Sequence, residues 1–275
     1  MTTTTTMQVV RDMPDAEYHA LTRCSASALK ALERSTPRHW HAQQDRDSAA
    51  LVQGRLLHCM VLTPGVLRET FACAPQVDRR TKEGKAAYAA FEAESAGRQV
   101  VSADVWAECE RMAYEVCRHP GAARLLEGTE RELSLIGTLM GVEAKARVDA
   151  YHPVGACIDI KTTRGLASRE EFERAIVGWG YGIQAAWYRM ALRAAGLACE
   201  HVAFVVVEKA EPYAVAVFRL ADDVIDWFDA ELPRLVDAWQ DAQQHPDRGW
   251  PATVQDIGVP AWFARRMEAQ EVGHG

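Results

Sequence analysis

The sequence predicts an α/β fold in which a mixed central β-sheet is flanked by helices. Between residues 132 and 163, apolar residues alternate with a period of two, which is typical of strands. Segments with a helical apolar period precede and follow this region. Two later apolar runs, over 202–207 and 214–219, predict a second pair of strands. This order of strands, helices and further strands predicts a mixed sheet with an N-terminal helical wrap.

The composition is that of an ordinary globular protein, with 48% hydrophobic and 25% charged residues in 275 positions. We expect a disordered tail over 1–17, a single domain over 18–265 with its core at about 130–220, and a C-terminal tail over 266–275. No run reaches the roughly 18 apolar residues of a membrane span, and the N-terminus lacks the features of a signal peptide. The seven cysteines form no CxxC pair, which predicts a reduced, cytoplasmic protein.

The net charge of −7 does not by itself indicate a nucleic-acid partner, because phosphate-binding domains usually carry a basic surplus. Cation-binding sites need clustered carboxylates, however, and basic residues need only gather along one groove. The composition therefore neither supports nor excludes binding to DNA.

Helices are expected first over 25–34, where Ser25 is the cap, and over 49–62, where Thr63-Pro64-Gly65 follows. A polar stretch separates them. Residues 66–100 are mixed and include a basic, turn-prone segment, DRRTKEGK. Ser102 caps a helix that extends to 118, and a short helix follows at 122–126.

Three strands are expected over 133–140, 142–151 and 154–162, with a turn at His152-Pro153-Val154-Gly155. Ser168 and Glu171 have the spacing of a capping box and predict a helix to about 177. A glycine-rich connector, GWGYG, precedes a helix over 183–195. After the last strand pair, the chain is expected to be helical to about 244.

The third strand of the meander carries two charges on one face. Because side chains alternate along a strand, Asp159 and Lys161 share one face while Ile158 and Ile160 share the other. A hairpin can bring Asp149 of the preceding strand close to Asp159. Burying such charges unpaired costs several kcal/mol, order of magnitude, so their clustering requires an explanation.

Two carboxylates and a lysine form the set of groups that phosphodiester hydrolysis needs. The carboxylates can bind Mg²⁺, which prefers oxygen ligands, and Mn²⁺ can substitute for it. The lysine can orient the attacking water and offset the charge of the transition state. An isolated Asp-x-Lys is more often a structural ion pair, so further motifs are needed to decide.

Those motifs are present in order along the chain. Gly54 and His58 form G-x-x-x-H, Asp149 and D-x-K-T follow, and Gln184 and Tyr188 form Q-x-x-x-Y. This set resembles the RecB-like and RecE-like nucleases of the PD-D/E-x-K superfamily. The segments SASALKALERSTPRHW and DRRTKEGKAAY resemble the RecE exonucleases (exonuclease VIII) in particular. The resemblance extends from about 18 to 262, with Val148 where the family often has proline.

The resemblance implies a role for each matching residue. It implies metal ligation by Asp149, Asp159 and the backbone carbonyl of Ile160, and positioning of the water by Lys161. It implies that His58 is a metal ligand or phosphate contact, although a histidine among leucines is more often a core residue. Gln184 and Tyr188 would support the site and contact the DNA backbone. Glu132 is a candidate for a further acidic contact, with Glu130 and Glu143 as alternatives.

Other candidates for DNA contacts follow from position and chemistry. Arg79, Arg80, Lys82 and Lys85 are either phosphate contacts or a solvated loop. Trp179 and Tyr181, in the glycine-rich connector, are candidates for stacking at a DNA end.

The resemblance implies digestion of linear double-stranded DNA from 5′ to 3′, leaving a 3′ single strand for recombination in phage or prophage systems. It also implies a single-strand annealing partner (RecT-like) and a homo-oligomer such as a tetrameric ring. One alternative is another nuclease of the superfamily, such as the Cas4-like enzymes, but no cysteine cluster follows Cys199 to hold their iron–sulfur cluster. The other alternative is a catalytically silent DNA-binding or scaffold protein of the same fold.

Overall fold

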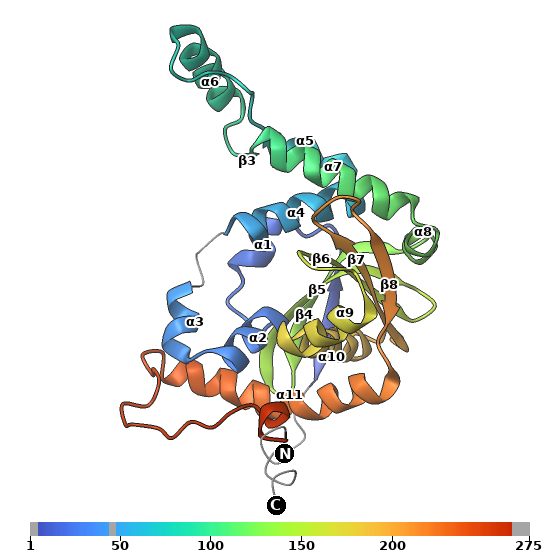
Figure 1. The fold of residues 1–275 in the computed structure, drawn as a ribbon. Helices are drawn as coiled ribbons and strands as arrows, with labels where there is room; N and C mark the ends of the chain where they lie inside the picture. The colour runs from blue at the N-terminus through green and yellow to red at the C-terminus, as the bar shows by residue number, and fades with distance from the viewer. Residues whose placement is uncertain (1–4, 44–47, 266–275) are drawn as a thin grey trace, which may run out of the picture.

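The computed structural model describes residues 5–43 and 48–265. At its centre is a six-stranded sheet with the order β1-β4-β5-β6-β7-β8 (Figure 1). Strands β6 and β7 are parallel and the other neighbours are antiparallel. The bounds of the strands are β1 (Thr6–Val10), β4 (Glu130–Leu139), β5 (Val142–His152), β6 (Ala156–Thr163), β7 (His201–Glu208) and β8 (Val215–Arg219). The predicted α/β fold with a mixed sheet is confirmed.

Helices cover both faces of this sheet, and most lie where the sequence predicts them. The parallel pair β6–β7 requires a crossover connection, which α9 and α10 provide. Ser25, Ser102 and Ser168 accept hydrogen bonds from backbone N–H groups as predicted caps. The helices are α1 (Asp15–Ala20), α2 (Ala26–Arg34), α3 (Pro37–Gln43), α4 (Ala49–Leu62), α5 (Leu67–Thr70), α6 (Lys82–Glu94), α7 (Ala103–Arg118), α8 (Pro120–Leu126), α9 (Arg169–Gly178), α10 (Tyr181–Ala194) and α11 (Asp222–Gln244).

Two hydrophobic clusters lie on opposite faces of the sheet. Alternate residues of β7 enter different clusters, with Phe204 in one and Val205 in the other. The first cluster contains residues of α2, α9, α10 and α11, and the second contains residues of α4, α7 and α8. A side chain at the sheet can therefore be reached from α10 on one face and from α4 on the other.

The N-terminal segment differs from its predicted form. Thr6–Val10 was expected to be a disordered tail, but it forms β1 and pairs antiparallel with β4 along Thr6↔Thr138 to Val10↔Ser134. The strand is short and follows a run of threonines that resembles a low-complexity tail. Its alternation of apolar and polar residues was therefore not visible in the sequence. Position 137 is glycine because a Cβ there would lie 2.1 Å from the Thr6 carbonyl oxygen. The predicted C-terminal tail, 266–275, lies outside the described residues.

Two further segments are more helical than expected. The stretch after Ser35 contains α3, and the basic segment near residue 80 begins α6. The Thr81 hydroxyl caps α6 by accepting from the Gly84 N–H at 2.9 Å, so residues that suggested a turn instead start a helix. With β2 (Phe71–Cys73) and β3 (Gln99–Val101) at its base, α6 forms an arm that projects from the body (Figure 1).

Among the described residues, no single helix has both the length and the apolar character needed to cross a membrane. Only α4 together with Pro64–Thr70, a pair bent by 116°, meets the requirement of length and composition.

The contact between α10 and α11 leads to a stability prediction. A Cβ on Gly182 would lie 2.0 Å from the Phe228 ring, so we expect Gly182→Ala to lower the free energy of unfolding by about 1–3 kcal/mol. Gly54, within α4, has no atom within 4 Å of a built Cβ. Gly54→Ala should therefore raise the free energy of unfolding by about 0.5–1 kcal/mol. Urea unfolding of both variants checks this, and equal effects would contradict it.

Candidate active site

The site begins where β5 and β6 separate. These strands pair only through Ala150↔Ile158, Tyr151↔Cys157 and His152↔Ala156. At the next position toward the start of β5, the Asp149 side chain accepts a hydrogen bond from the Ile160 backbone N–H at 2.8 Å. A carboxylate therefore takes the place of a strand partner and is held at 7% exposure between the two strands.

Asp159 and Lys161 lie side by side on one face of β6, as the alternation predicts. Ile158 and Ile160 point into the cluster on the opposite face. Asp159 is 1% exposed, and its Oδ2 forms an ion pair with the Lys161 ammonium. Burial lowers the pKa of Lys161, but Asp159 and Asp149 outweigh burial and leave that pKa above its usual value. Lys161 is thus held as a cation beside two carboxylates.

Gln184 of α10 reaches Asp159 from the same face. Its Nε2 donates to Asp159 Oδ1 at 2.7 Å and to the Tyr188 hydroxyl at 3.0 Å. Gln184 and Tyr188 share one face of α10, as predicted. Only Gln184 contacts the Asp159 carboxylate directly, and Tyr188 contacts Gln184. The amide orients Asp159 with one oxygen toward Lys161.

His58 approaches from α4, on the other face of the sheet. Its Nε2 lies 3.0 Å from the Ile160 carbonyl oxygen, and its Nδ1 lies 3.6 Å from Asp149 Oδ2. Because a carbonyl only accepts, the Nε2 contact requires N–H there and turns Nδ1 toward Asp149. Burial lowers the pKa of His58, but Asp149 and Glu132 outweigh burial and raise it overall. The Ile160 carbonyl, predicted as a metal ligand, is thus already engaged by His58.

Glu132 joins the site through an unusual backbone conformation. Its φ of 48° lies in the left-handed region, which is costly for a residue with a Cβ. The β4–β5 register contains Arg131↔Ala150 and Leu133↔Val148 but no pairing at Glu132. Burial and the nearby Asp149 raise the pKa of Glu132 to about 7.

The structure separates Glu132 from the two alternative glutamates. Glu130 pairs with Arg11 at 2.7 Å, and Glu143 pairs with Arg23 at 3.4 Å. Glu132 instead lies with His58 and Asp149, with one ligand atom of each within 4.8 Å of the others. Asp159, also predicted as a ligand, is not a member of this closest set.

This set fits a divalent cation. The two carboxylates supply the hard oxygen ligands that Mg²⁺ prefers, and the imidazole nitrogen of His58 makes Mn²⁺ an equally suitable ion. Burial, followed by the neighbouring Asp149, raises the pKa of Glu132 to about 7, so the negative charge of Glu132 is costly without a bound cation. His58, Glu132 and Asp149 are therefore the residues that would hold such a metal.

The aromatic candidates occupy different environments. Trp179 is 58% exposed, and the Arg34 guanidinium lies over its ring at 4.7 Å. Tyr181 was expected in a connector, but it begins α10 and stacks on Phe172 with ring centroids 5.9 Å apart. Its ring faces the Lys161 ammonium at 5.0 Å. Trp179 is thus placed to meet an external partner, whereas Tyr181 lines the site.

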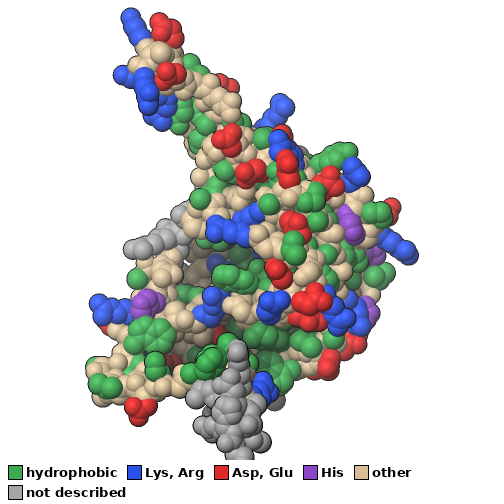
Figure 2. Space-filling model, viewed as in Figure 1, with side chains coloured by type: hydrophobic (Ala, Val, Ile, Leu, Met, Phe, Trp, Pro, Cys, Tyr) green, Lys and Arg blue, Asp and Glu red, His purple; other side chains and the backbone are tan. Residues whose placement is uncertain are grey.

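The four basic candidates lie at the tip of the arm, away from the carboxylates. Figure 2 shows Lys and Arg side chains at the tip of the arm, with Asp and Glu side chains beside them. All four are exposed, and the Arg79 guanidinium stacks on Tyr88 of α6 at 3.8 Å. They are Arg79, Arg80, Lys82 and Lys85. The structure therefore does not bring them to the active site within one copy of the chain.

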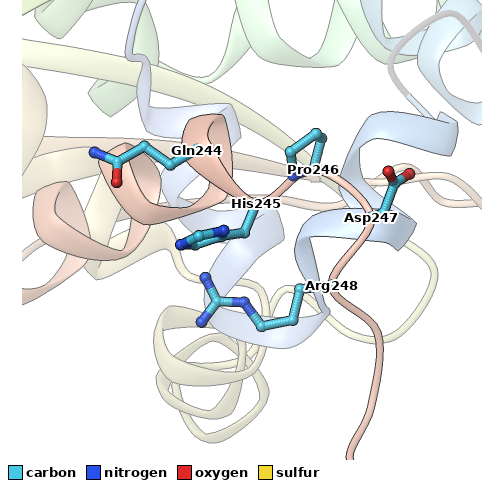
Figure 3. Close-up of a pocket in the computed structure, with 5 residues that line it drawn as sticks. All are labelled: Gln244, His245, Pro246, Asp247 and Arg248. Atoms are coloured by element: carbon cyan, nitrogen blue, oxygen red, sulfur yellow. The ribbon is translucent and has the colours of Figure 1, made fainter.

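Two surface hollows lie outside the carboxylate cluster. One, of about 530 Å³, is formed by the turn Gln244–Arg248 after α11 (Figure 3). The other, of about 370 Å³, lies at α1, α4 and the base of the arm, where Asp15, His19 and Arg55 line it. Neither is lined by a residue that the motifs single out.

Sequence reasoning missed one residue of the site, Lys30 of α2. Its Nζ donates to Gln184 Oε1 at 2.6 Å. The available signal was its spacing, because Lys30 follows the buried Ala26 by four positions and therefore borders the apolar face of the helix.

The assignment of His58, Glu132 and Asp149 as metal ligands leads to a prediction that distinguishes Glu132 from Glu130. Titration calorimetry with Mn²⁺ should show binding to the unaltered protein, and Glu132→Gln should weaken it by at least about tenfold. Glu130→Gln is the matched control, since Glu130 only pairs with Arg11. Equal affinity of the two variants would contradict the assignment of Glu132.

Comparison with a solved structure supports the fold described above. No curated protein matches the sequence. The fold is similar to a crystal structure from Eubacterium rectale described as a "Putative exonuclease", with a TM-score of 0.59 and 14% identity over 93% of this chain and 98% of that one. A crystal structure of SSO0001 matches at 18% identity over 71% and 88% of the two chains, but its TM-score of 0.30 supports no conclusion.

A family model matches residues 16–252, which includes all the described carboxylates of the site and the α2 and α10 helices. That range covers most of the chain, and the domain that the family model describes is PDDEXK-like. The chain therefore belongs to the family of the PDDEXK-like domain of unknown function (DUF3799).

Proposed function

We propose that this protein is a metal-dependent exodeoxyribonuclease that degrades linear double-stranded DNA. The observation that carries the proposal is the meeting of Asp149, Asp159 and Lys161 where β5 and β6 separate, with His58 and Glu132 beside them. A structural ion pair alone would not need Glu132 in a left-handed conformation next to a second carboxylate. Membership of a PDDEXK-like family supports the same conclusion.

The residues divide the chemistry of hydrolysis between them. A divalent cation such as Mg²⁺ or Mn²⁺ would supply Lewis acidity toward the scissile phosphate. The Lys161 ammonium is placed to orient the attacking water and to offset negative charge in the transition state. Gln184 holds Asp159 in position through the 2.7 Å hydrogen bond.

The choice of substrate and polarity rests on the resemblance to RecE exonucleases. Digestion from 5′ to 3′ would leave a 3′ single strand for a RecT-like annealing protein in a phage or prophage recombination system. A homo-oligomeric ring, such as a tetramer, would keep the enzyme on its DNA, in a reduced cytoplasm that suits the free cysteines of the described residues.

The arm supports a role in DNA binding despite the acidic net charge. Arg79 and Arg80 precede α6, and Lys82 and Lys85 lie at its start, so the four are exposed together at the tip of the arm, with Asp78 and Glu83 among them. Phosphate contacts need only a local basic surface. In an oligomer, the arm of one copy can contact DNA that occupies the site of another.

The first test is cleavage of linear duplex DNA labelled separately at each 5′ and 3′ end. We expect early release of the 5′ label with Mg²⁺ and none with EDTA. Lys161→Ala should slow cleavage by at least about 100-fold, because an electrostatic contribution to the transition state of this kind is worth about 3–4 kcal/mol. Covalently closed circles should remain intact.

Each other outcome selects an alternative. Cleavage of circles would indicate another nuclease of the superfamily, and early release of the 3′ label would reverse the polarity. A folded protein that binds DNA but cuts nothing in Mg²⁺ or Mn²⁺ would be the silent scaffold.

A second prediction concerns the arm. Neutralising Arg79, Arg80, Lys82 and Lys85 to glutamine should weaken duplex binding. The slope of log affinity against log salt should fall by about one for each phosphate that the arm no longer neutralises. Arg118 and Arg124, exposed on α7 and α8, provide the control as a double glutamine variant. An unchanged slope for the arm variant would show that these residues are only a solvated surface.

A further inference from the structure

Lys30 reaches the site from α2, which the sequence motifs do not include. Ser25 caps this helix, and Ala26, Ala28 and Leu29 are buried against the body of the protein. Because Lys30 borders that buried face, its side chain is directed inward and is only partly exposed. The helix therefore delivers a cation to the interior.

The glycine-rich connector makes room for this side chain. Gly180, just before α10, has a φ of 68°, and a Cβ there would lie 2.8 Å from Lys30 Cγ. Any other residue at this position would displace the stem of Lys30. The glycine at position 180 thus has a local cause, which is the passage of Lys30 toward Gln184.

The contact with Gln184 sets the orientation of an amide. Lys30 Nζ donates to Gln184 Oε1 at 2.6 Å, and an ammonium group cannot accept. The amide oxygen must therefore face Lys30, which leaves Nε2 to donate to Asp159. Lys30, Gln184, Asp159 and Lys161 form one chain of polar contacts in which both ends are cations.

Lys30 makes no ion pair with a described carboxylate. Its polar partner Gln184 is neutral, and Asp159 and Asp149 act on it only from a distance and offset part of its charge. Lys161 is close enough to act on it, and the two ammonium groups lie 5.7 Å and 5.0 Å from the centre of the same Tyr181 ring. Burial, followed by repulsion from Lys161, lowers the pKa of Lys30 to about 8. An anion bound between the two lysines would relieve this repulsion.

We propose that Lys30 is a further substrate-binding residue, whose ammonium contacts a phosphate oxygen of the DNA strand beside Lys161. The proposal rests on the function proposed above and names the phosphate as the missing anion. One of the three donors of the ammonium is used by Gln184, and the others are available for phosphate oxygens. Gln184 then serves as the tether that holds Lys30 in place before the substrate arrives.

The test is the salt dependence of duplex binding, measured by fluorescence anisotropy in EDTA so that no cleavage occurs. Lys30→Met should weaken binding by about tenfold and lower the salt slope by about one, and Lys30→Arg should restore both. Lys209→Met is the matched control, because Lys209 makes the same kind of contact, to Gln53 Oε1 at 2.9 Å, outside the carboxylate cluster. Its slope should be that of the unaltered protein.

A Gln184→Leu protein shows whether Lys30 contacts the DNA itself or only positions Gln184. If Lys30 acted only through Gln184, then Lys30→Met would have no further effect in a Gln184→Leu protein. We expect the reduction of affinity and of slope to persist there. Disappearance of the effect in that background, or an unchanged slope for Lys30→Met in the otherwise unaltered protein, would overturn the proposal. Thermal melting of each variant checks folding, because Lys30→Met leaves the buried Gln184 Oε1 without its donor.

The same experiment separates this inference from the proposed function. If the unaltered protein binds duplex through Lys30 but cuts nothing with Mg²⁺ or Mn²⁺, the nuclease proposal fails and the Lys30 site stands. If it cuts duplex and Lys30→Met keeps the full salt slope and affinity, the Lys30 site fails and the nuclease stands. If it neither binds nor cuts, both fail.

Discussion

The hydrogen bond from the Ile160 N–H to the Asp149 carboxylate occupies the point where β5 and β6 cease to pair. Without an acceptor, that buried N–H would cost about 1–3 kcal/mol. A carboxylate satisfies it and at the same time becomes fixed between the strands. The separation of the strands opens the sheet from both faces, so that His58 can enter from α4 and Gln184 from α10. The remaining geometry of the site depends on this local break in the ladder.

The charges of the site are unevenly distributed between its two sides. On the α4 side, Glu132 and Asp149 lie beside a single imidazole, and the pKa of Glu132 is raised to about 7. On the α10 side, Lys30 and Lys161 both lie near the Tyr181 ring, and Asp159 forms an ion pair with Lys161 but not with Lys30. One half therefore favours a cation and the other favours an anion. A divalent metal bound to a phosphate supplies both charges at adjacent positions, which is why we assign the site to phosphodiester chemistry.

The acidic net charge of −7 is compatible with the proposed substrate because phosphate contacts depend on local positive charge. Arg79, Arg80, Lys82 and Lys85 are exposed at the tip of the arm, although Asp78 and Glu83 lie among them. The inner lysines are held by neutral or acidic partners within the body. Phosphate binding depends on where positive charge lies, and the total charge of the chain does not report this.

The sequence by itself determined the α/β class, the boundaries of α4 and α7, and the shared face of Asp159 and Lys161. These features depend on periodicity and capping, which act over a few residues. It did not reveal β1, because a short segment with a weak alternation becomes a strand only when β4 supplies hydrogen-bond partners. It named Glu132 as the candidate but kept Glu130 and Glu143 as alternatives, since the partners of all three are distant in the chain. Lys30 belongs to the same class: its role follows from α2 packing beside α10, 154 positions later. Local interactions thus set the elements, whereas only tertiary packing decided which charges are left without a partner and could serve a metal or a phosphate.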